Sequence, residues 1–199
     1  MAAGGAARFD AQYYRRFYGD AATRVTSRQD IARLARFVCA YLIYLDLPVR
    51  RVLDAGCGLG WWRAPLRQRY PDVVYTGIEV SEYLCREHGW QRASLVDFRS
   101  DAPFDLVICQ GVMQYLDDRE AAAAIDNLGV LCRGALYLEA LTRADWQDSV
   151  DRSRTDGAVR LRSGAWYRRR LARHFVNVGG GLFVHREAPV VTFELERLV

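Results

Sequence analysis

The sequence predicts a doubly wound α/β fold, with a mostly parallel seven-stranded sheet, a C-terminal antiparallel hairpin and helices on both faces. Short apolar segments of strand length alternate with segments of helical periodicity between residues 51 and 141. These short segments are apolar throughout, as expected of parallel strands that are covered on both faces. Apolar and polar residues alternate from Val191 to Glu196, which is the period of a half-exposed edge strand.

Seven strands follow from these patterns. The expected parallel strands are Arg51–Asp54, Val73–Glu79, Ser94–Phe98, Phe104–Gln110 and Ala135–Leu141. The expected hairpin joins Leu182–His185 to the alternating strand through Arg186–Pro189, and strands joined by so short a turn run antiparallel.

Helices are expected between these strands. Ser27 followed by Asp30 is typical of a helix N-terminus, and Leu47-Pro48 marks the end of that helix. Pro65 fits most easily in the first turn of a helix, so a second helix should begin near Trp61 or Trp62. Two further helices are expected, one with a face formed by Ile125, Leu128 and Leu131, and one that starts at Ser163 and carries Trp166, Leu171 and Phe175.

The chain of 199 residues is long enough for one sizeable core, which favours a single domain. We expect an N-terminal arm over residues 1–26, with a packed aromatic cluster of Tyr13, Tyr14, Phe17 and Tyr18, and one domain over residues 27–199. No apolar run approaches the roughly 18 residues of a membrane-spanning helix, and the first residues lack the pattern of a secretory signal. The sequence therefore predicts a cytoplasmic protein without a membrane partner.

The charge pattern says little about partners. All 28 basic residues are arginine, which together with abundant alanine and glycine indicates the codon bias of a GC-rich genome. A net charge of +4 spread along the chain is typical of a solvated surface and does not favour nucleic-acid binding. The five cysteines are far apart and odd in number, so neither a disulfide framework nor a metal site is expected.

The segment most informative about chemistry is Val52-Leu53-Asp54-Ala55-Gly56-Cys57-Gly58-Leu59-Gly60, which ends the first strand and leads into a helix. Alternate glycines allow a sharp turn and let a ligand lie against bare main chain. A dinucleotide fingerprint would need glycine where Trp61 stands, and a phosphate-binding loop would need a lysine. The remaining pattern is D-x-G-x-G-x-G with an acidic residue at the strand end.

This segment resembles the first motif of class I, Rossmann-like S-adenosylmethionine-dependent methyltransferases, and the resemblance covers about residues 50–141. It implies S-adenosylmethionine as cofactor, S-adenosylhomocysteine as product, and a cofactor site lined by Asp54, Gly56, Cys57, Gly58 and Gly60. In this family the glycine turn lies under the methionine part of the cofactor.

Further cofactor contacts are expected at the ends of the next strands. Glu79 closes the second strand about 20 residues beyond the glycines, where a carboxylate can accept both hydrogen bonds of a ribose diol. By resemblance, the neighbouring Val80 would contact the adenine, and Asp97 with Phe98 would hold its amine and ring. Gln110 follows the fourth strand and resembles the family segment that borders cofactor and substrate.

The sequence leaves the catalytic groups unknown, because a methyl group on a sulfonium is already activated and positioning can suffice. Tyr14 of the arm could close over the cofactor, with core packing as its alternative. The candidate substrate-side groups are Tyr115, Glu139, Asp145 and Trp146. Residues 142–164 are the expected substrate cover, and their arginines Arg152, Arg154, Arg160 and Arg162 should be solvated or else meet an acidic small molecule.

We expect methyl transfer to a small-molecule acceptor. Transfer to RNA or protein remains an alternative on account of Arg168-Arg169-Arg170, and a catalytically silent protein that keeps the cofactor pocket as a scaffold is another. A nicotinamide-dependent enzyme is opposed by Trp61. The sequence does not identify the acceptor, the methylated atom or the oligomeric state.

Overall fold

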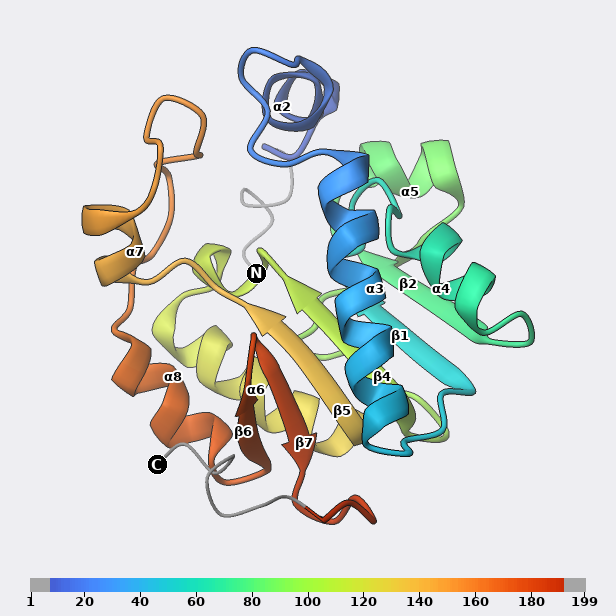
Figure 1. Cartoon of the computed structure of the whole chain (residues 1–199). Coiled ribbons are helices and arrows are strands. Elements are labelled where there is room, and N and C mark those ends of the chain that lie inside the picture. The colour runs from blue at the N-terminus through green and yellow to red at the C-terminus, as the bar shows by residue number, and fades with distance from the viewer. Residues whose placement is uncertain (1–7, 192–199) are drawn as a thin grey trace.

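The computed structural model describes residues 8–191, and these residues form one seven-stranded sheet with helices on both faces (Figure 1). The strand order is β3-β2-β1-β4-β5-β7-β6. The first five strands are parallel to one another, whereas β7 runs antiparallel to both β5 and β6. The expected doubly wound, mostly parallel sheet is thus confirmed.

The strands are β1 (Arg51–Ala55), β2 (Val74–Glu79), β3 (Gln91–Arg92), β4 (Phe104–Gln110), β5 (Cys132–Glu139), β6 (Phe175–Gly179) and β7 (Leu182–His185). The helices are α2 (Ala11–Tyr14), the π-helical turn η1 (Arg15–Gly19), α3 (Arg28–Tyr44), α4 (Arg63–Arg69), α5 (Glu82–His88), the 3-10 turn η2 (Met113–Tyr115), α6 (Asp118–Leu131), α7 (Arg143–Asp148) and α8 (Gly164–Leu171).

Alternate residues of the central strands face two separate cores. Leu53, Val107 and Leu136 pack with α6 and α8 on one face of the sheet. Val52 and Leu106, their neighbours in the strands, pack with α3 and α4 on the other. Because each central strand is buried on both sides, its sequence is mostly apolar.

The predicted start of α3 is confirmed in detail. The Ser27 side chain accepts a hydrogen bond from the Asp30 amide, and the Asp30 carboxylate accepts one from the Ser27 amide. This capping box satisfies two main-chain donors that the helix itself leaves without partners. Pro65 lies in the first turn of α4, as its missing amide hydrogen predicted.

The predicted third strand, Ser94–Phe98, is wrong. The strand is only Gln91–Arg92, and residues 95–97 form a turn in which the Phe98 amide donates to the Ser94 carbonyl at 2.9 Å. The Asn127 side chain on α6 holds this turn by donating to the carbonyls of Leu95 and Phe98. The side chains of Leu95 and Phe98 therefore reach the same core. In a strand, two residues at a spacing of three would point to opposite faces.

The C-terminal hairpin is present, but one strand earlier than expected. Phe175, assigned from the sequence to the helix after Ser163, begins β6 instead, and α8 ends at Leu171. β6 pairs with β7 through a turn in which Gly179, Gly180 and Gly181 all have positive φ. The alternating segment that was expected to pair with residues 182–185 lies almost entirely outside the described residues.

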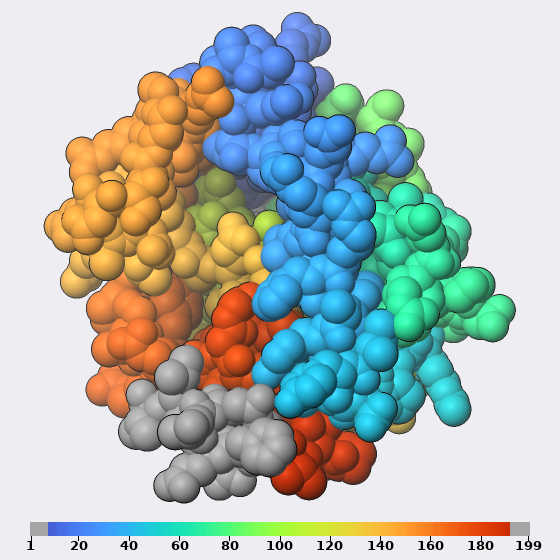
Figure 2. Space-filling model, in the orientation of Figure 1, coloured from blue at the N-terminus to red at the C-terminus, as the bar shows by residue number. Residues whose placement is uncertain are grey.

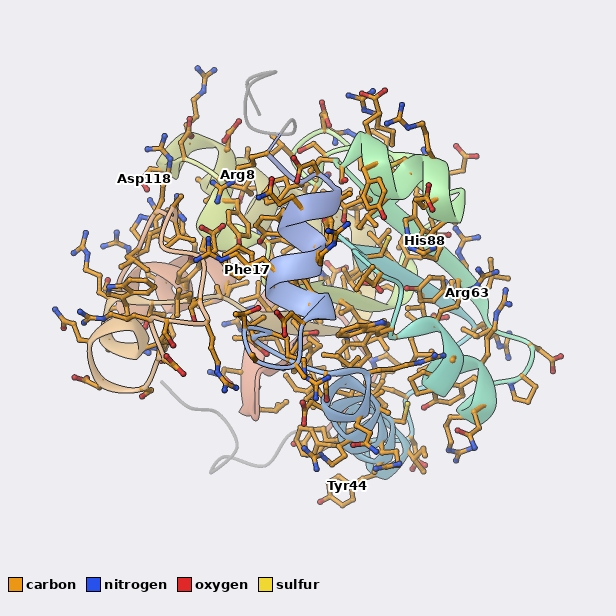
Figure 3. All side chains as sticks on the ribbon, turned by 90° about the horizontal axis from the view of Figure 1, so that it is seen from above. Arg8, Phe17, Tyr44, Arg63, His88 and Asp118 are labelled. Atoms are coloured by element: carbon orange, nitrogen blue, oxygen red, sulfur yellow. The ribbon has the colours of Figure 1, made fainter. Side chains whose placement is uncertain are left out.

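Two segments rise over the carboxyl ends of the parallel strands (Figure 1). One is the N-terminal arm, here residues 8–26, which carries α2 and η1. The other, residues 142–163, contains α7 and is here named the cover. Seen from above, the arm crosses the middle of the molecule between Arg8 and Phe17 (Figure 3). Within residues 8–191, no helix has the length and apolar character needed to cross a membrane.

Arg162 at the end of the cover is buried, contrary to the expectation that it is solvated or meets a substrate. Its side chain is only 4% exposed and donates to the Met113 carbonyl at 2.9 Å and to the Leu116 carbonyl. It also pairs with Asp118 at 2.8 Å. The guanidinium therefore fastens the cover to the segment after β4. Arg152, Arg154 and Arg160 are exposed, as expected.

We expect Arg162→Ala to lower the free energy of unfolding by about 3 kcal/mol, because it leaves the Leu116 carbonyl without this donor and removes the stronger of two donors to the Met113 carbonyl. The control is Arg160→Ala, whose side chain is exposed and which should cost less than about 0.5 kcal/mol. Urea unfolding followed by circular dichroism measures both. Equal stability of the two variants would contradict the structural role assigned to Arg162.

Candidate functional site

A cavity of about 510 Å³ lies at the carboxyl ends of β1, β2, β4 and β5, under the arm and the cover. In Figure 2 the surface is hollowed between the arm and the segment around α7. This is the position where open α/β sheets bind ligands. The volume suits a ligand of the size of a nucleoside with a substituent.

The glycine turn after β1 forms part of the cavity wall. Gly56, Gly58 and Gly60 have φ values of +73°, +53° and +67°, which side-chain-bearing residues rarely adopt. A Cβ on Gly56 would lie 2.4 Å from the side chain of Val112, and one on Gly60 would lie 2.4 Å from the ring of Trp90. At Gly58 a Cβ would meet only a carbonyl oxygen at 4.0 Å. Gly56 and Gly60 are thus needed for packing, whereas Gly58 presents bare main chain to open space.

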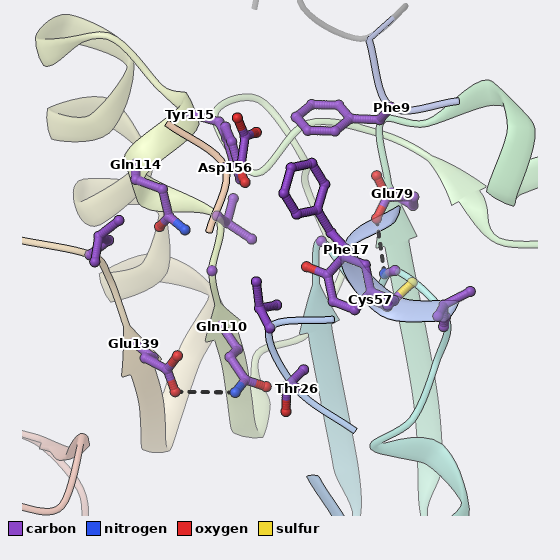
Figure 4. A pocket seen from close by; sticks show the side chains of 18 of the residues that line it. Phe9, Phe17, Thr26, Cys57, Glu79, Gln110, Gln114, Tyr115, Glu139 and Asp156 are labelled. Carbon is purple, nitrogen blue, oxygen red and sulfur yellow. Dashed lines mark hydrogen bonds between the residues drawn. The ribbon is translucent and has the colours of Figure 1, made fainter. Parts of the chain in front are cut away.

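Glu79 holds this turn in place. Its carboxylate is buried, and Oε2 accepts a hydrogen bond from the Gly58 amide at 2.9 Å. Oε1 accepts from the amides of Val80 and Ser81 at 2.7 and 2.9 Å. Three main-chain donors therefore stabilise the buried charge, and about one acceptor position of the carboxylate remains for a ligand. Figure 4 shows this side chain facing the cavity beside Cys57.

Asp54 ends β1 and also lines the cavity. It is 2% exposed and accepts a hydrogen bond from the Tyr75 hydroxyl. Burial raises the pKa of this carboxyl from 3.8 to about 7, although the bond from Tyr75 opposes the shift. A cation brought close to Asp54 would favour its ionised form.

Gln110 connects the ends of β4 and β5. Its Oε1 accepts from the Trp62 indole at 2.9 Å, and its Nε2 donates to Oε2 of Glu139 at 3.1 Å. The Tyr137 hydroxyl donates to the same oxygen at 3.0 Å. Both side chains of the Gln110–Glu139 pair line the cavity (Figure 4). Trp62 therefore fixes the orientation of Gln110, and Tyr137 fixes that of Glu139.

The arm closes the cavity with aromatic side chains. Tyr14 and Phe17 are each 9% exposed and line the cavity with Phe9, Tyr13 and Tyr18. The hydroxyls of Tyr13 and Tyr115 form a hydrogen bond of 2.8 Å, and the Phe9 ring packs edge-on against Tyr115. The arm is thereby joined to the segment after β4.

The arm is also joined to the cover. Arg8 forms an ion pair with Asp156 and donates to the Ala158 carbonyl at 2.9 Å. The Arg8 guanidinium also lies 5.1 Å from the centre of the Tyr115 ring. These contacts bring together three segments that are far apart in the sequence at the rim of the cavity.

Most of the residues expected at the cofactor site line this one cavity. They are Tyr14, Asp54, Gly56, Cys57, Gly58, Glu79, Val80 and Gln110. Gly60 shapes the same turn without lining the cavity. Burial raises the pKa of the Cys57 thiol, so this residue stays protonated. Of the substrate-side candidates, Tyr115, Glu139 and Asp145 line the cavity, whereas Trp146 packs under Arg152.

The structure does not bring Asp97 and Phe98 to the cavity. Asp97 is exposed, and Phe98 packs in the core beside α6. Ala93, Ser94 and Leu95 line the cavity in their place. The reason is the turn held by Asn127, which directs the chain away from the cavity after Leu95.

Some lining residues lie in segments that the sequence predicts near the site but were not named individually. Val112 and Gln114 follow Gln110 directly, and their proximity to the fourth strand was an available signal. Thr155 and Asp156 lie in the cover, and no local pattern marks them as pocket residues. Only the folding of the cover onto the arm brings them there.

Comparison with known proteins shows which proteins this chain is similar to. A family model described as a methyltransferase domain matches residues 53–134. A trans-aconitate 2-methyltransferase of Azoarcus sp. (strain BH72) is 34% identical over 74 residues, which is 34% of this chain and 29% of that protein. The matched part therefore spans less than a third of the length of that curated relative.

Solved structures extend the likeness to the whole fold. The magnesium protoporphyrin IX methyltransferase of Synechocystis PCC 6803 with bound S-adenosylmethionine has a TM-score of 0.59 at 22% identity, over 89% of this chain and 90% of that one. A sugar N-methyltransferase of Streptoalloteichus sp. has a TM-score of 0.61 at 20% identity, over 80% and 89%.

Over residues 53–134 the chain is therefore similar to a methyltransferase domain. Its fold is that of the class I, Rossmann-like S-adenosylmethionine-dependent methyltransferases.

The glycines offer a test of the turn. We expect Gly58→Ala to cost about 1–2 kcal/mol of stability, because only the positive φ is unfavourable there. Gly56→Ala and Gly60→Ala should each cost about 1–3 kcal/mol more, because the new methyl group meets Val112 or Trp90 at 2.4 Å. Gly89→Ala is the matched control for strain alone, since its φ is +69° and nothing lies within 4 Å. Equal losses at all four glycines, measured by urea unfolding, would contradict this ranking.

Asp54 should make stability depend on pH. Between 3.8 and about 7 the folded protein holds a proton on Asp54 that the unfolded chain has released. Because the folded state binds more protons in this range, the contribution of Asp54 to the free energy of unfolding falls as the pH rises through it. Asp54→Asn removes this contribution and can still accept the bond from Tyr75.

We therefore expect the stability of Asp54→Asn relative to the wild type to increase from about pH 4 to about pH 8. Urea midpoints of both proteins at several pH values measure the difference, which cancels the titration of other groups. A difference that does not change with pH would show that Asp54 is ionised throughout.

Proposed function

We propose that this protein transfers a methyl group from S-adenosylmethionine to a small-molecule acceptor. The observation that carries the proposal is the bare main chain of Gly58 at the cavity, directly bonded to the buried carboxylate of Glu79. This combination gives a ligand close access to the backbone and leaves a hydrogen-bond acceptor beside it.

The residues present fit the cofactor. S-adenosylmethionine carries a positively charged sulfonium and an ammonium group, and Asp54 and Glu79 supply negative charge at the ends of β1 and β2. We assign its amino acid part to the turn around Gly56 and Gly58, and its ribose to Glu79. Val80 and Leu95 would then contact the adenine as apolar neighbours.

When bound, S-adenosylmethionine supplies a methyl group whose carbon–sulfur bond breaks as a nucleophile attacks, leaving the electron pair on sulfur. The chain's own residues then have to bind, orient and exclude water. The arm serves these purposes, because Phe9, Tyr14 and Phe17 cover the cavity with buried side chains. Cys57 contributes no thiolate nucleophile, since burial raises its pKa.

A small acceptor is favoured over RNA or protein by the closure of the site. The Arg8–Asp156 pair and the Tyr13–Tyr115 hydrogen bond span the rim of a cavity of about 510 Å³. The arginines 168–170 of α8 do not line this cavity, and Arg170 stacks on the Trp166 ring at 3.8 Å. The named relatives also act on small molecules according to their descriptions: trans-aconitate, magnesium protoporphyrin IX and a sugar.

We expect the wild type to bind S-adenosylmethionine and S-adenosylhomocysteine with micromolar affinity in calorimetry. Gly58→Arg should abolish binding, because its side chain would enter the open space at the turn. Glu79→Ala should weaken binding at least tenfold, because the turn loses the acceptor that holds the Gly58 amide.

Gly89→Ala is the matched control, since it shares the backbone strain of a Gly58 variant but lies at the end of α5. It should bind both ligands like the wild type. Absence of binding to a folded wild type would overturn the proposal. Binding without turnover on any acceptor would instead favour a catalytically silent scaffold.

A further inference from the structure

The cavity lining is acidic, although the protein is rich in arginine. Five carboxylates line it, and no arginine or histidine is among the lining residues within the described part of the chain. The carboxylates are Asp54, Glu79, Glu139, Asp145 and Asp156. Since the sequence has 28 arginines and a net charge of +4, the lining departs from the charge of the whole chain. A ligand with negative charge would be repelled here and would find no basic partner in the lining.

Four of these carboxylates are already engaged. Asp54 accepts from Tyr75, and Glu79 accepts from three main-chain amides. Asp145 caps α7 by accepting from the Thr142 amide and hydroxyl. Asp156 pairs with Arg8, whose charge is thereby neutralised at the rim of the cavity.

Asp54, Asp145 and Glu139 each keep one oxygen without a described donor, but Asp54 is buried and Asp145 caps α7, whereas Glu139 is exposed at the cavity. Gln110 and Tyr137 both donate to Oε2, and no described residue donates to Oε1. The side chain is exposed to the cavity, and the two bonds to Oε2 fix its direction. It lies at the end of β5, away from the glycine turn and Glu79 (Figure 4).

A second acceptor without a partner lines the same side of the cavity. Oε1 of Gln114 is buried and receives no hydrogen bond from the described residues. An unpartnered buried carbonyl is unfavourable, and rotation of the amide would turn this oxygen toward the cavity. Glu139 and Gln114 thus offer hydrogen-bond acceptors to a ligand that supplies donors.

Aromatic rings form a large part of the remaining wall. Tyr13, Phe17, Tyr18 and Tyr115 line the cavity, and burial raises the pKa of each tyrosine hydroxyl among them. These rings are therefore neutral, and neutral aromatic faces attract cations.

We propose that the methyl acceptor is a small amine, bound as its ammonium ion with Oε1 of Glu139 as the main contact and Gln114 as the second. This inference rests on the proposed methyltransferase function and names its substrate class. It excludes a polycarboxylate of the kind named for the trans-aconitate relative, because the lining offers no basic side chain to bind it.

Glu139 also has a proton to accept. An ammonium nitrogen has no lone pair, so it must lose one proton before it can take up a methyl group. Oε1 of Glu139 receives this proton, the electron pair of the N–H bond stays on nitrogen, and the proton passes on to water. Gln110 and Tyr137 keep Oε1 directed at the ammonium and act as positioning residues.

Calorimetry on protein saturated with S-adenosylhomocysteine tests the proposal without relying on turnover. Three probes of similar size differ only in the end group: tyramine carries an amine, tyrosol a hydroxyl and 4-hydroxyphenylacetate a carboxylate. We expect tyramine to bind at least tenfold more tightly than the other two, and trans-aconitate not to bind. Equal affinities for the three probes would overturn the proposal. So would tighter binding of tyrosol, 4-hydroxyphenylacetate or trans-aconitate than of tyramine.

Glu139→Gln keeps the size of the side chain and removes its charge. We expect it to lower the affinity for tyramine about tenfold or more and to leave the affinity for S-adenosylhomocysteine within threefold. The matched control is Glu87→Gln, an exposed residue on α5 outside the cavity, which should change neither. Loss of S-adenosylhomocysteine binding in Glu139→Gln would assign Glu139 to the cofactor and overturn the proposal.

Gln114→Leu provides a second variant that leaves Glu139 unchanged, and it should lower the affinity for tyramine by about threefold or more. Unchanged affinity for tyramine in both variants would also overturn the proposal. If the folded wild type fails to bind S-adenosylhomocysteine at all, the methyltransferase function fails first. If it binds S-adenosylhomocysteine but shows no preference for tyramine, only the assignment of an amine fails.

Discussion

The site depends on the hydrogen bonds that the buried carboxylate of Glu79 receives from the main chain. The Gly58 amide belongs to the turn after β1, and the amides of Val80 and Ser81 belong to the segment that joins β2 to α5. One side chain thus joins the ends of two neighbouring parallel strands. A buried charge is tolerable only when it is satisfied in this way, so the carboxylate and the turn stabilise each other.

Two other contacts complete the site from distant parts of the chain. Arg162 fastens the cover to the segment after β4, and Arg8 joins the arm to Asp156 of the cover. Both are arginines whose importance depends on burial or pairing. The other arginines of the cover are exposed, which shows that residue type alone does not separate a structural cation from a solvated one.

The parallel strands, the capping box at Ser27 and Asp30, and the glycine turn could be predicted because each rests on local periodicity or on a backbone requirement. The third strand and the role of Phe98 could not. There, Asn127 on α6 imposes a turn on residues 95–97, so a contact between distant segments overrides the local apolar pattern. Phe175 was likewise assigned to a helix, whereas pairing with β7 makes it part of a strand.

By itself, the sequence determined the fold class, most of the parallel strands and the acidic and glycine residues at their ends, because parallel strands bring these ends to one edge. Tertiary structure alone decided which carboxylate presents an unused oxygen to the cavity from an exposed side chain. Glu139 and Asp145 each keep one oxygen without a described donor, but Asp145 caps α7 whereas Glu139 is exposed to the cavity. The cap formed by Asp145 follows the local Thr142–Asp145 spacing, whereas the bond from Gln110 to Glu139 joins two strands and leaves no local pattern.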